Sequence, residues 1–200
     1  MSRQNHLFRS LLTLPNLLTS FRFLAAPGLL VFAWFGHEHA FMGLLALVFL
    51  SDVLDGLAAR LTGQVTEFGA TLDSFADLLT YMTIAVCSFW LWPELVMREL
   101  VYVIMIVVSC IAPPAAGMIK FGRLTSYHTW LVKLAALSVG VSLFILFSGG
   151  PVWPLRIAAF VSLGAALEEI IITFLLSDPE SNVRSLWNVL KKRQQSLWRK

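Results

Sequence analysis

Residues 52–77 read DVLDGLAARLTGQVTEFGATLDSFAD and hold four of the five aspartates in the chain. Apolar runs precede and follow this stretch, so its carboxylates lie inside or at the ends of apolar segments. Asp52 and Asp55 are three positions apart and Asp73 and Asp77 are four apart, so each pair shares one face of a helix. A carboxylate inside a membrane span costs at least about 2.5–3.5 kcal/mol on insertion scales, and it therefore needs a cation, a partner or water.

The chain as a whole has the composition of a membrane protein. Of its 200 residues 58% are hydrophobic and 14% are charged, whereas soluble domains have about 45–50% apolar and about 25% charged residues. This excludes a separate soluble domain and a disordered chain. The basic residues flank apolar runs and form no aromatic-rich basic face, so no nucleic acid is expected as a partner. Cys87 and Cys110 lie in apolar runs, which indicates neither a disulfide nor a zinc site.

We predict an all-α polytopic membrane protein with six transmembrane helices, because each apolar run is long enough to cross a bilayer. The predicted spans are residues 17–36, 40–59, 71–92, 99–119, 130–148 and 155–176. They form a membrane core over residues 17–176 of a single domain, residues 1–200.

The two ends of the chain are amphipathic. Residues 5–13 mix Leu and Phe with Arg9 and His6, which predicts an interfacial helix within residues 1–14. Residues 177–200 form a basic tail, for which we expect binding to anionic lipids. A regulatory or partner-binding role for this tail is the alternative.

The distribution of Lys and Arg predicts which ends of the spans are cytoplasmic. Eleven basic residues fall on the side of the termini and of the 60–70 and 118–128 loops, against two, Arg98 and Arg156, on the other side. The eleven are Arg3, Arg9, Arg60, Lys120, Arg123, Arg184, Lys191, Lys192, Arg193, Arg199 and Lys200. By the positive-inside rule both termini are cytoplasmic.

The four aspartates predict a metal site near the cytoplasmic interface. The second predicted span ends at Arg60 and the third begins near Thr71, so we expect two antiparallel neighbouring helices that bring the carboxylates together. Oxygen donors suit Mg²⁺ or Mn²⁺, and Mg²⁺ is commonly bound through carboxylates together with substrate phosphates. Arg60 lies at the mouth, where its guanidinium could bind a phosphate. The structural alternative is that Asp and Arg only neutralise one another.

The order Asp52, Asp55, Gly56, Ala59, Arg60, Gly69, Asp73 and Asp77 resembles the eight-position signature of the CDP-alcohol phosphotransferase family, with every spacing permitted. The segment from Leu14 to Thr19, together with Arg22, is similar to the start of members that make phospholipids. The resemblance implies six spans, a preceding interfacial helix and a homodimer.

The resemblance also implies a reaction. Members transfer a substituted phosphate from a CDP-linked donor, commonly CDP-diacylglycerol, to the hydroxyl of an alcohol and release CMP. It implies two divalent ions, Mg²⁺ or Mn²⁺, held by Asp52, Asp55, Asp73 and Asp77, with Asp77 also the general base. It implies that the CDP subsite is lined by Gly56, Ala59, Arg60 and Gly69.

The acceptor is indicated less directly. Lys120, Arg123, His128 and Lys133 form a basic patch that would suit an acceptor with its own phosphate, such as glycerol 3-phosphate or inositol phosphate. Positive-inside anchoring explains the same residues equally well. The stretch from Asp73 to Asp77 resembles phosphatidylserine synthases, whereas residues 122–125 resemble phosphatidylglycerophosphate synthases. We therefore expect glycerol 3-phosphate, with serine or inositol phosphate as alternatives.

A function of another class is also compatible with intramembrane carboxylates, which mark ion pathways in divalent-cation transporters. Transporters commonly place such sites near the midplane between repeated halves, whereas the four aspartates here crowd one side. A catalytically inactive scaffold is a further alternative. Glu168 and Glu169 fall within the last span, and their role is left open between hydrogen bonds to a neighbouring helix, a dimer contact and an interfacial position.

Overall fold

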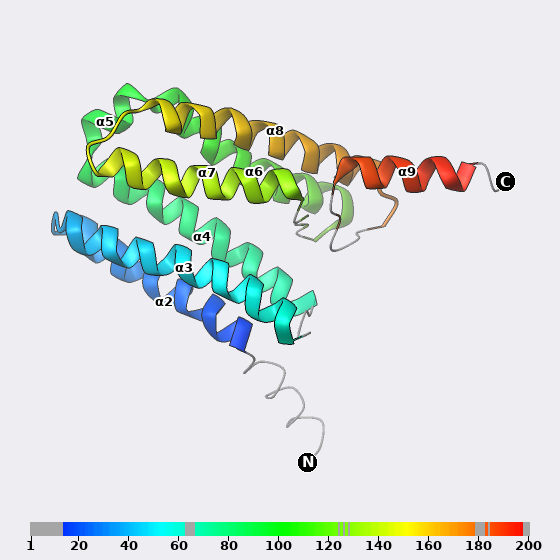
Figure 1. Cartoon of the computed structure of the whole chain (residues 1–200), viewed down its shortest axis with the longest axis horizontal. Helices are drawn as coiled ribbons and strands as arrows, with labels where there is room; N and C mark the ends of the chain where they lie inside the picture. Colours follow the sequence, from blue (N-terminus) through cyan, green and yellow to red (C-terminus); the bar gives the residue numbers. More distant parts are fainter. Residues whose placement is uncertain are drawn as a thin grey trace, which may run out of the picture. The chain divides into compact units, whose positions relative to one another are not determined.

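The computed structural model describes residues 14–62, 67–123, 125, 127, 129–178, 183 and 185–197. Within these residues every regular element is an α-helix (Figure 1). The all-α prediction is therefore confirmed for the described part of the chain. Residues 1–13, which carry most of the predicted interfacial helix, lie outside it. The chain divides into two compact units, Met1–Val96 and Met97–Lys200, and each is treated by itself below.

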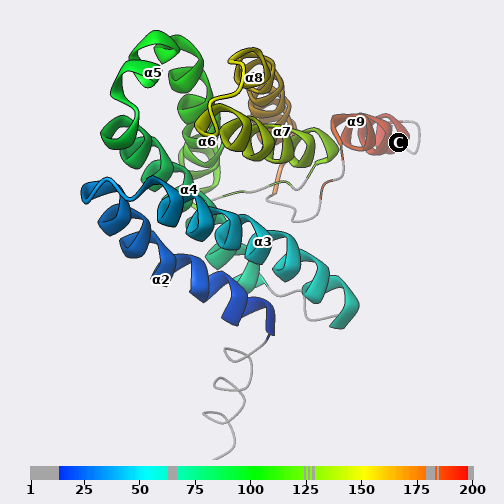
Figure 2. The same cartoon turned by 60° about the vertical axis from the view of Figure 1, so that its left-hand side comes forward.

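The first unit is built around helix α2. It contains α2 (Leu14–Trp34), α3 (Glu38–Thr62) and α4 (Glu67–Leu91), and α2 packs along both of the others (Figure 2). The buried side chains of α2 recur every three or four positions, as expected for a helix with one packed stripe. They are Thr19, Arg22, Ala25, Ala26, Leu29 and Ala33. The alanines allow close helix approach, so the guanidinium of Arg22 is carried into the space between α3 and α4.

The second unit is built around helix α8. It contains α6 (Leu100–Phe121), α7 (Trp130–Phe147), α8 (Trp153–Leu175) and α9 (Leu186–Leu197), and α8 packs against the other three. The packed stripe of α8 consists mostly of small residues, which again permits close approach. Its members are Leu155, Ala158, Ala159, Ser162, Ala165, Ala166, Glu169, Ile172 and Thr173. A short helix that the sequence did not predict, α5 (Pro93–Arg98), connects α4 to α6 along the chain.

Five of the described helices are long and apolar enough to cross a membrane. The qualifying segments are Leu17–Trp34, Leu72–Leu91, Leu100–Phe121, Trp130–Phe147 and Trp153–Leu175. They bear many exposed apolar side chains, such as Leu24 at 78% and Ile119 at 84% exposure. Soluble monomers rarely expose large apolar surfaces, so exposed apolar helices of this length indicate that the protein is integral to a membrane.

The predicted span 40–59 lies inside α3, but α3 is not among the five qualifying helices. Five of the six predicted spans thus correspond to helices that can cross a membrane. A membrane span at residues 40–59 stays a prediction.

Candidate functional site

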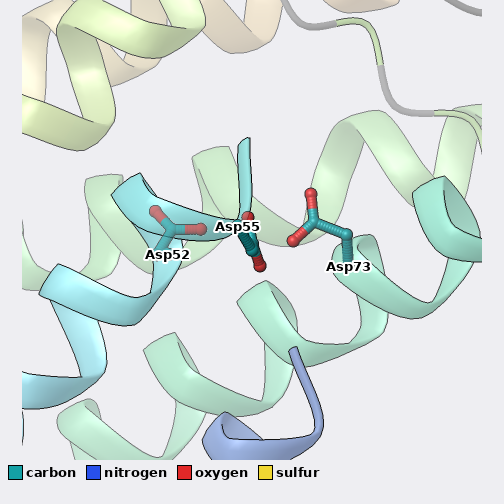
Figure 3. A group of neighbouring side chains, drawn as sticks. All are labelled: Asp52, Asp55 and Asp73. Atoms are coloured by element: carbon teal, nitrogen blue, oxygen red, sulfur yellow. The ribbon is translucent and has the colours of Figure 1, made fainter. Parts of the chain in front are cut away.

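Helices α3 and α4 bring three of the predicted metal ligands together. Asp52 and Asp55 come from α3 and Asp73 from α4, and one carboxylate oxygen from each lies within 4.8 Å of the other two. Figure 3 shows the three side chains turned toward a common space. The helical spacing explains the two aspartates of α3, since positions three apart share a face. The convergence with α4 comes from the packing of both helices on α2.

The side chain of Arg22 ties all four aspartates together. Its Nη1 donates to Oδ1 of Asp52 at 2.9 Å and also to Oδ1 of Asp77. Its Nη2 donates to Oδ2 of Asp55 at 2.9 Å and also to Oδ1 of Asp73. Asp77 therefore belongs to the same group as the three converging carboxylates. All four predicted ligands are brought to one place.

A second side chain of α2 also contacts this group. The hydroxyl of Thr19 donates to Oδ2 of Asp55 at 3.1 Å. Thr19 and Arg22 are both buried, the arginine with only 2% of its surface exposed. One turn of α2 therefore supplies both the cation and a neutral hydrogen-bond donor.

The sequence reasoning assigned no role to Arg22 or Thr19. A signal for the arginine was present, because Arg22 is the sole charged residue of α2 and four intramembrane carboxylates require a cation. It also falls on the stripe that includes Ala25 and Ala26, small residues that permit close packing. Which helix would pack against α3 and α4 could not be read from this pattern.

The charges and donor atoms of the group fit divalent cations. Four carboxylates and one guanidinium leave three formal negative charges. A guanidinium already lies where a positive charge is required, and the donors are the oxygen atoms that Mg²⁺ and Mn²⁺ prefer. The group can therefore hold divalent metal.

The residues predicted to bind CDP lie on the same two helices. Gly56, Ala59 and Arg60 follow Asp55 on α3, and Gly69 lies one turn before Asp73 on α4. The side chains at positions 56, 59 and 60 lie outside the described part of the structure. Their assignment stays a prediction that is consistent with the helical positions.

Lys120, one of the predicted acceptor residues, has a structural task in the second unit. Its ammonium donates to the carbonyl oxygens of Thr173 at 3.0 Å, Phe174 at 2.9 Å and Leu176 at 2.7 Å. These are carbonyls at the C-terminal end of α8, where helix carbonyls lack intrahelical partners and a cation is favourable. The three bonds employ all three N–H groups of the ammonium.

The other predicted acceptor residues also belong to the second unit. Arg123 is exposed just after α6. Lys133 lies on α7, and its Nζ is 5.0 Å from the centre of the Trp130 ring, a cation–π distance. His128 lies outside the described residues.

The structure gives Glu168 and Glu169 a role that the sequence left open. Glu169 accepts a hydrogen bond from the Tyr127 N–H at 2.9 Å. Glu168 accepts from the Thr129 hydroxyl at 2.8 Å and from the Leu186 N–H, at the start of α9, at 2.9 Å. The two glutamates thus fasten the segment before α7, and the beginning of α9, to α8.

An ion pair in the second unit contrasts with the aspartate group. Arg156 donates through Nε and Nη2 to the two oxygens of Glu99 at 2.8 and 2.9 Å. Glu99 lies between α5 and α6, outside the candidate spans. The hydrogen bonds from Arg156 hold the pKa of Glu99 below its usual value. Nε of Arg98 lies 3.6 Å from the same carboxylate, so Glu99 meets two cations and carries no uncompensated negative charge.

Comparisons with known proteins identify the family of the chain. A family model for CDP-alcohol phosphatidyltransferases matches residues 12–174. A probable phosphatidylglycerophosphate synthase of Mycobacterium tuberculosis is 28% identical over 173 residues, which cover 80% of this chain and 77% of the relative. A CDP-diacylglycerol--glycerol-3-phosphate 3-phosphatidyltransferase of Cereibacter sphaeroides is 41% identical over 69 residues, 32% of this chain and 31% of the relative. No solved structure matches the chain.

Proposed function

Because the chain belongs to the CDP-alcohol phosphatidyltransferase family, we propose that it moves a phosphatidyl group from CDP-diacylglycerol to glycerol 3-phosphate. The hydroxyl of glycerol 3-phosphate forms the new phosphate ester, and CMP is the leaving group. Membership makes the chain a phospholipid-synthesising transferase, and its apolar helices place it in a membrane. The choice of glycerol 3-phosphate is supported by the names of the relatives, with serine or inositol phosphate as the alternative acceptors.

The observation that carries the proposal is the convergence of Asp52, Asp55 and Asp73, with Asp77 bound to the same arginine. Two divalent ions, Mg²⁺ or Mn²⁺, when bound by these carboxylates would offset the charge that develops on the diphosphate as it breaks. Asp77 also takes the proton of the acceptor hydroxyl as general base. Gly56, Ala59, Arg60 and Gly69 bind the CDP part of the donor, as the family signature implies.

The phosphate of the acceptor is bound by Arg123 and Lys133, with His128 as a further contributor and Lys120 contributing only on exchange of its bonds to the carbonyls at the end of α8. A dianionic acceptor needs cations, whereas free serine does not. Arg123 is exposed and its guanidinium suits a phosphate. Replacement of Arg123 by Gln is expected to raise the KM for glycerol 3-phosphate more than it changes kcat.

Two features of the whole assembly complete the proposal. The active site and both termini face the cytoplasm, on the argument that basic residues concentrate on that side. The protein acts as a homodimer, as the family resemblance implies.

The test of this function is CMP release by the purified full-length protein in detergent. CDP-diacylglycerol and Mg²⁺ or Mn²⁺ are supplied, with glycerol 3-phosphate, serine or inositol phosphate added one at a time. Asp77→Asn is compared with Asp178→Asn, the aspartate that lies exposed outside the group. We expect release with glycerol 3-phosphate, its loss in Asp77→Asn and its retention in Asp178→Asn.

The outcomes separate the parts of the proposal. Release with serine alone would replace the acceptor and leave the reaction class intact. Equal activity of Asp77→Asn and wild type would remove Asp77 from its role as base. Metal-independent release would contradict the role of the four carboxylates.

A further inference from the structure

The guanidinium of Arg22 occupies an unusual position for a structural arginine. It is buried, and its two terminal nitrogens bind four carboxylates from two helices. Within the described residues its Nε–H has no hydrogen-bond partner. A structural ion pair, such as Arg156 with Glu99, has no excess of carboxylates and uses the Nε–H as well.

Because of the net charge of the group, the position of Arg22 depends on whether divalent ions are bound. One positive charge among four negative ones leaves the carboxylates repelling one another at close range. Divalent cations would relieve that repulsion, but they need the same carboxylates, and they repel a guanidinium that lies among them. Binding of the ions and pairing of Arg22 with the aspartates therefore compete.

A guanidinium that leaves the carboxylates remains close to them, because the backbone of Arg22 is fixed by the packing of α2 on α3 and α4. The planar fork of an arginine matches the oxygens of a phosphate, and the Nε–H with one terminal nitrogen forms a bidentate edge. The Nε–H of Arg22 is already unengaged. In the proposed reaction, the diphosphate of the donor is the anion that lies closest to the four aspartates.

We propose that Arg22 is an exchangeable counter-ion, which holds the four aspartates in the absence of metal, is displaced by divalent ions, and then binds a diphosphate oxygen of the nucleotide donor. This inference rests on the proposed function in that the four aspartates hold the ions. It goes further by giving Arg22 two successive partners, first the four aspartates and then the diphosphate of the donor. Arg22 therefore opposes metal binding and favours nucleotide binding.

The first measurement is Mn²⁺ binding to the purified full-length protein in detergent. Binding is monitored through the electron paramagnetic resonance signal of free Mn²⁺. Arg22→Gln is compared with wild type, and Arg98→Gln, an exposed arginine outside the group, is the control. We expect the Mn²⁺ dissociation constant of Arg22→Gln to fall by about tenfold, within the usual range of coupling between two sites. Arg98→Gln is expected to bind as wild type does.

The second measurement is equilibrium dialysis of labelled CDP at saturating Mn²⁺. Arg22→Gln is expected to bind CDP about tenfold or more weakly, although it binds Mn²⁺ more tightly, because a charged hydrogen bond to the diphosphate is lost. A higher affinity for Mn²⁺ together with a lower affinity for CDP is the result that the exchange predicts. A purely structural arginine would weaken both or neither, and either of those results would overturn the proposal.

A folding defect in Arg22→Gln does not prevent a decision. Recovery of the folded protein by Mn²⁺ would support the role as counter-ion, because the ions then replace the missing charge. Without such recovery, Arg22→Lys decides, since its single nitrogen keeps the charge but cannot bridge four carboxylates as a fork does. Its Mn²⁺ dissociation constant must fall about threefold or more for the proposal to stand.

The failure of this inference and that of the proposed function give different results. Wild-type protein that binds no Mn²⁺ would overturn the metal site, and the exchange with it. Wild-type protein that binds Mn²⁺, with the affinities for Mn²⁺ and CDP both unchanged in Arg22→Gln, would overturn only the role of Arg22.

Discussion

Carboxylates lie within apolar helices in both units, but the two units provide them with different hydrogen-bond and ion-pair partners. In the first unit, four aspartates converge on one shared guanidinium. In the second, Glu168 and Glu169 of α8 accept hydrogen bonds from two backbone N–H groups and one hydroxyl. The first arrangement retains an excess of negative charge, whereas the second joins each carboxylate to neutral donors on adjoining segments.

The difference distinguishes a group suited to binding ions from a contact that holds the fold together. Donors that belong to the backbone cannot be exchanged, so Glu168 and Glu169 fix the positions of the segment before α7 and of α9. A shared side chain with four partners can be exchanged for ions of higher charge. Burial and a negative charge alone thus do not identify a functional carboxylate, and the identity of its partners decides.

The largest effect is expected from Asp73→Asn. Loss of one of the converging carboxylates should lower kcat/KM for CMP release by about 10³-fold, roughly 4 kcal/mol, since a bound metal supplies several kcal/mol of charge stabilisation. Glu169→Gln is the matched control, because an amide oxygen can still accept from the Tyr127 N–H. It should retain activity within about threefold, the ratio that corresponds to roughly 0.65 kcal/mol. Comparable losses of kcat/KM in both variants would contradict the distinction between functional aspartates in the first unit and structural glutamates in the second.

The next effect is a loss of stability in Gly117→Ala. A Cβ at this position in α6 would clash with the Thr125 hydroxyl and lie 2.9 Å from the Thr125 backbone nitrogen. Such overpacking costs about 1–3 kcal/mol and should lower the thermal unfolding midpoint measured in detergent.

Gly43→Ala is the matched control for that change, since nothing lies within 4 Å of a Cβ there. Alanine has the higher helix propensity, so the midpoint of this variant should stay level or rise. A midpoint for Gly117→Ala equal to that of wild type would show that the 125–129 segment is held less tightly than the contacts of Glu168 and Glu169 indicate.

A smaller effect is expected from Lys120→Met, which removes the bonds to the carbonyls at the end of α8. A cation at a helix C-terminus contributes up to about 1 kcal/mol at an exposed site, and a change of that size shifts the midpoint of a chain this long by about 2–4 °C. The KM for glycerol 3-phosphate, measured on the same samples, separates this task from acceptor binding. A higher KM with no change in the midpoint would assign Lys120 to the acceptor alone.

The smallest effect at neutral pH concerns the pair of Glu99 with Arg156. The folded-state pKa of Glu99 is below its usual value of 4.5, so the pair stabilises the fold above about pH 4.5, and this stabilisation is lost as pH falls through the folded-state pKa. The difference in unfolding midpoint between wild type and Glu99→Gln should therefore shrink from pH 7 toward pH 3. A difference that is independent of pH would show that Glu99 acts through packing and not through its charge.

Much of the fold follows from local patterns in the sequence. Long apolar runs predict helices in a bilayer, and α6, α7 and α8 lie within about two residues of the predicted spans at each end. Spacings of three and four predict that Asp52 pairs with Asp55 and Asp73 with Asp77 on one helix face, because such positions adjoin on any α-helix. The same spacing carries the family signature, so the chemistry proposed for the site rests on the sequence pattern and not on the geometry.

Only the tertiary structure decided which partners these charges meet. Arg22 lies 30 residues before Asp52 and 55 before Asp77, and no local rule relates such distant positions. The packing of α2 against α3 and α4 sets this contact, and the packing of α8 against α7 and α9 joins Glu168 to Thr129 and Leu186. The sequence by itself determined the long apolar helices, their membrane character and the faces that carry charge. The pairing of those faces depends on how the whole set of helices packs, which periodicity within one helix does not specify.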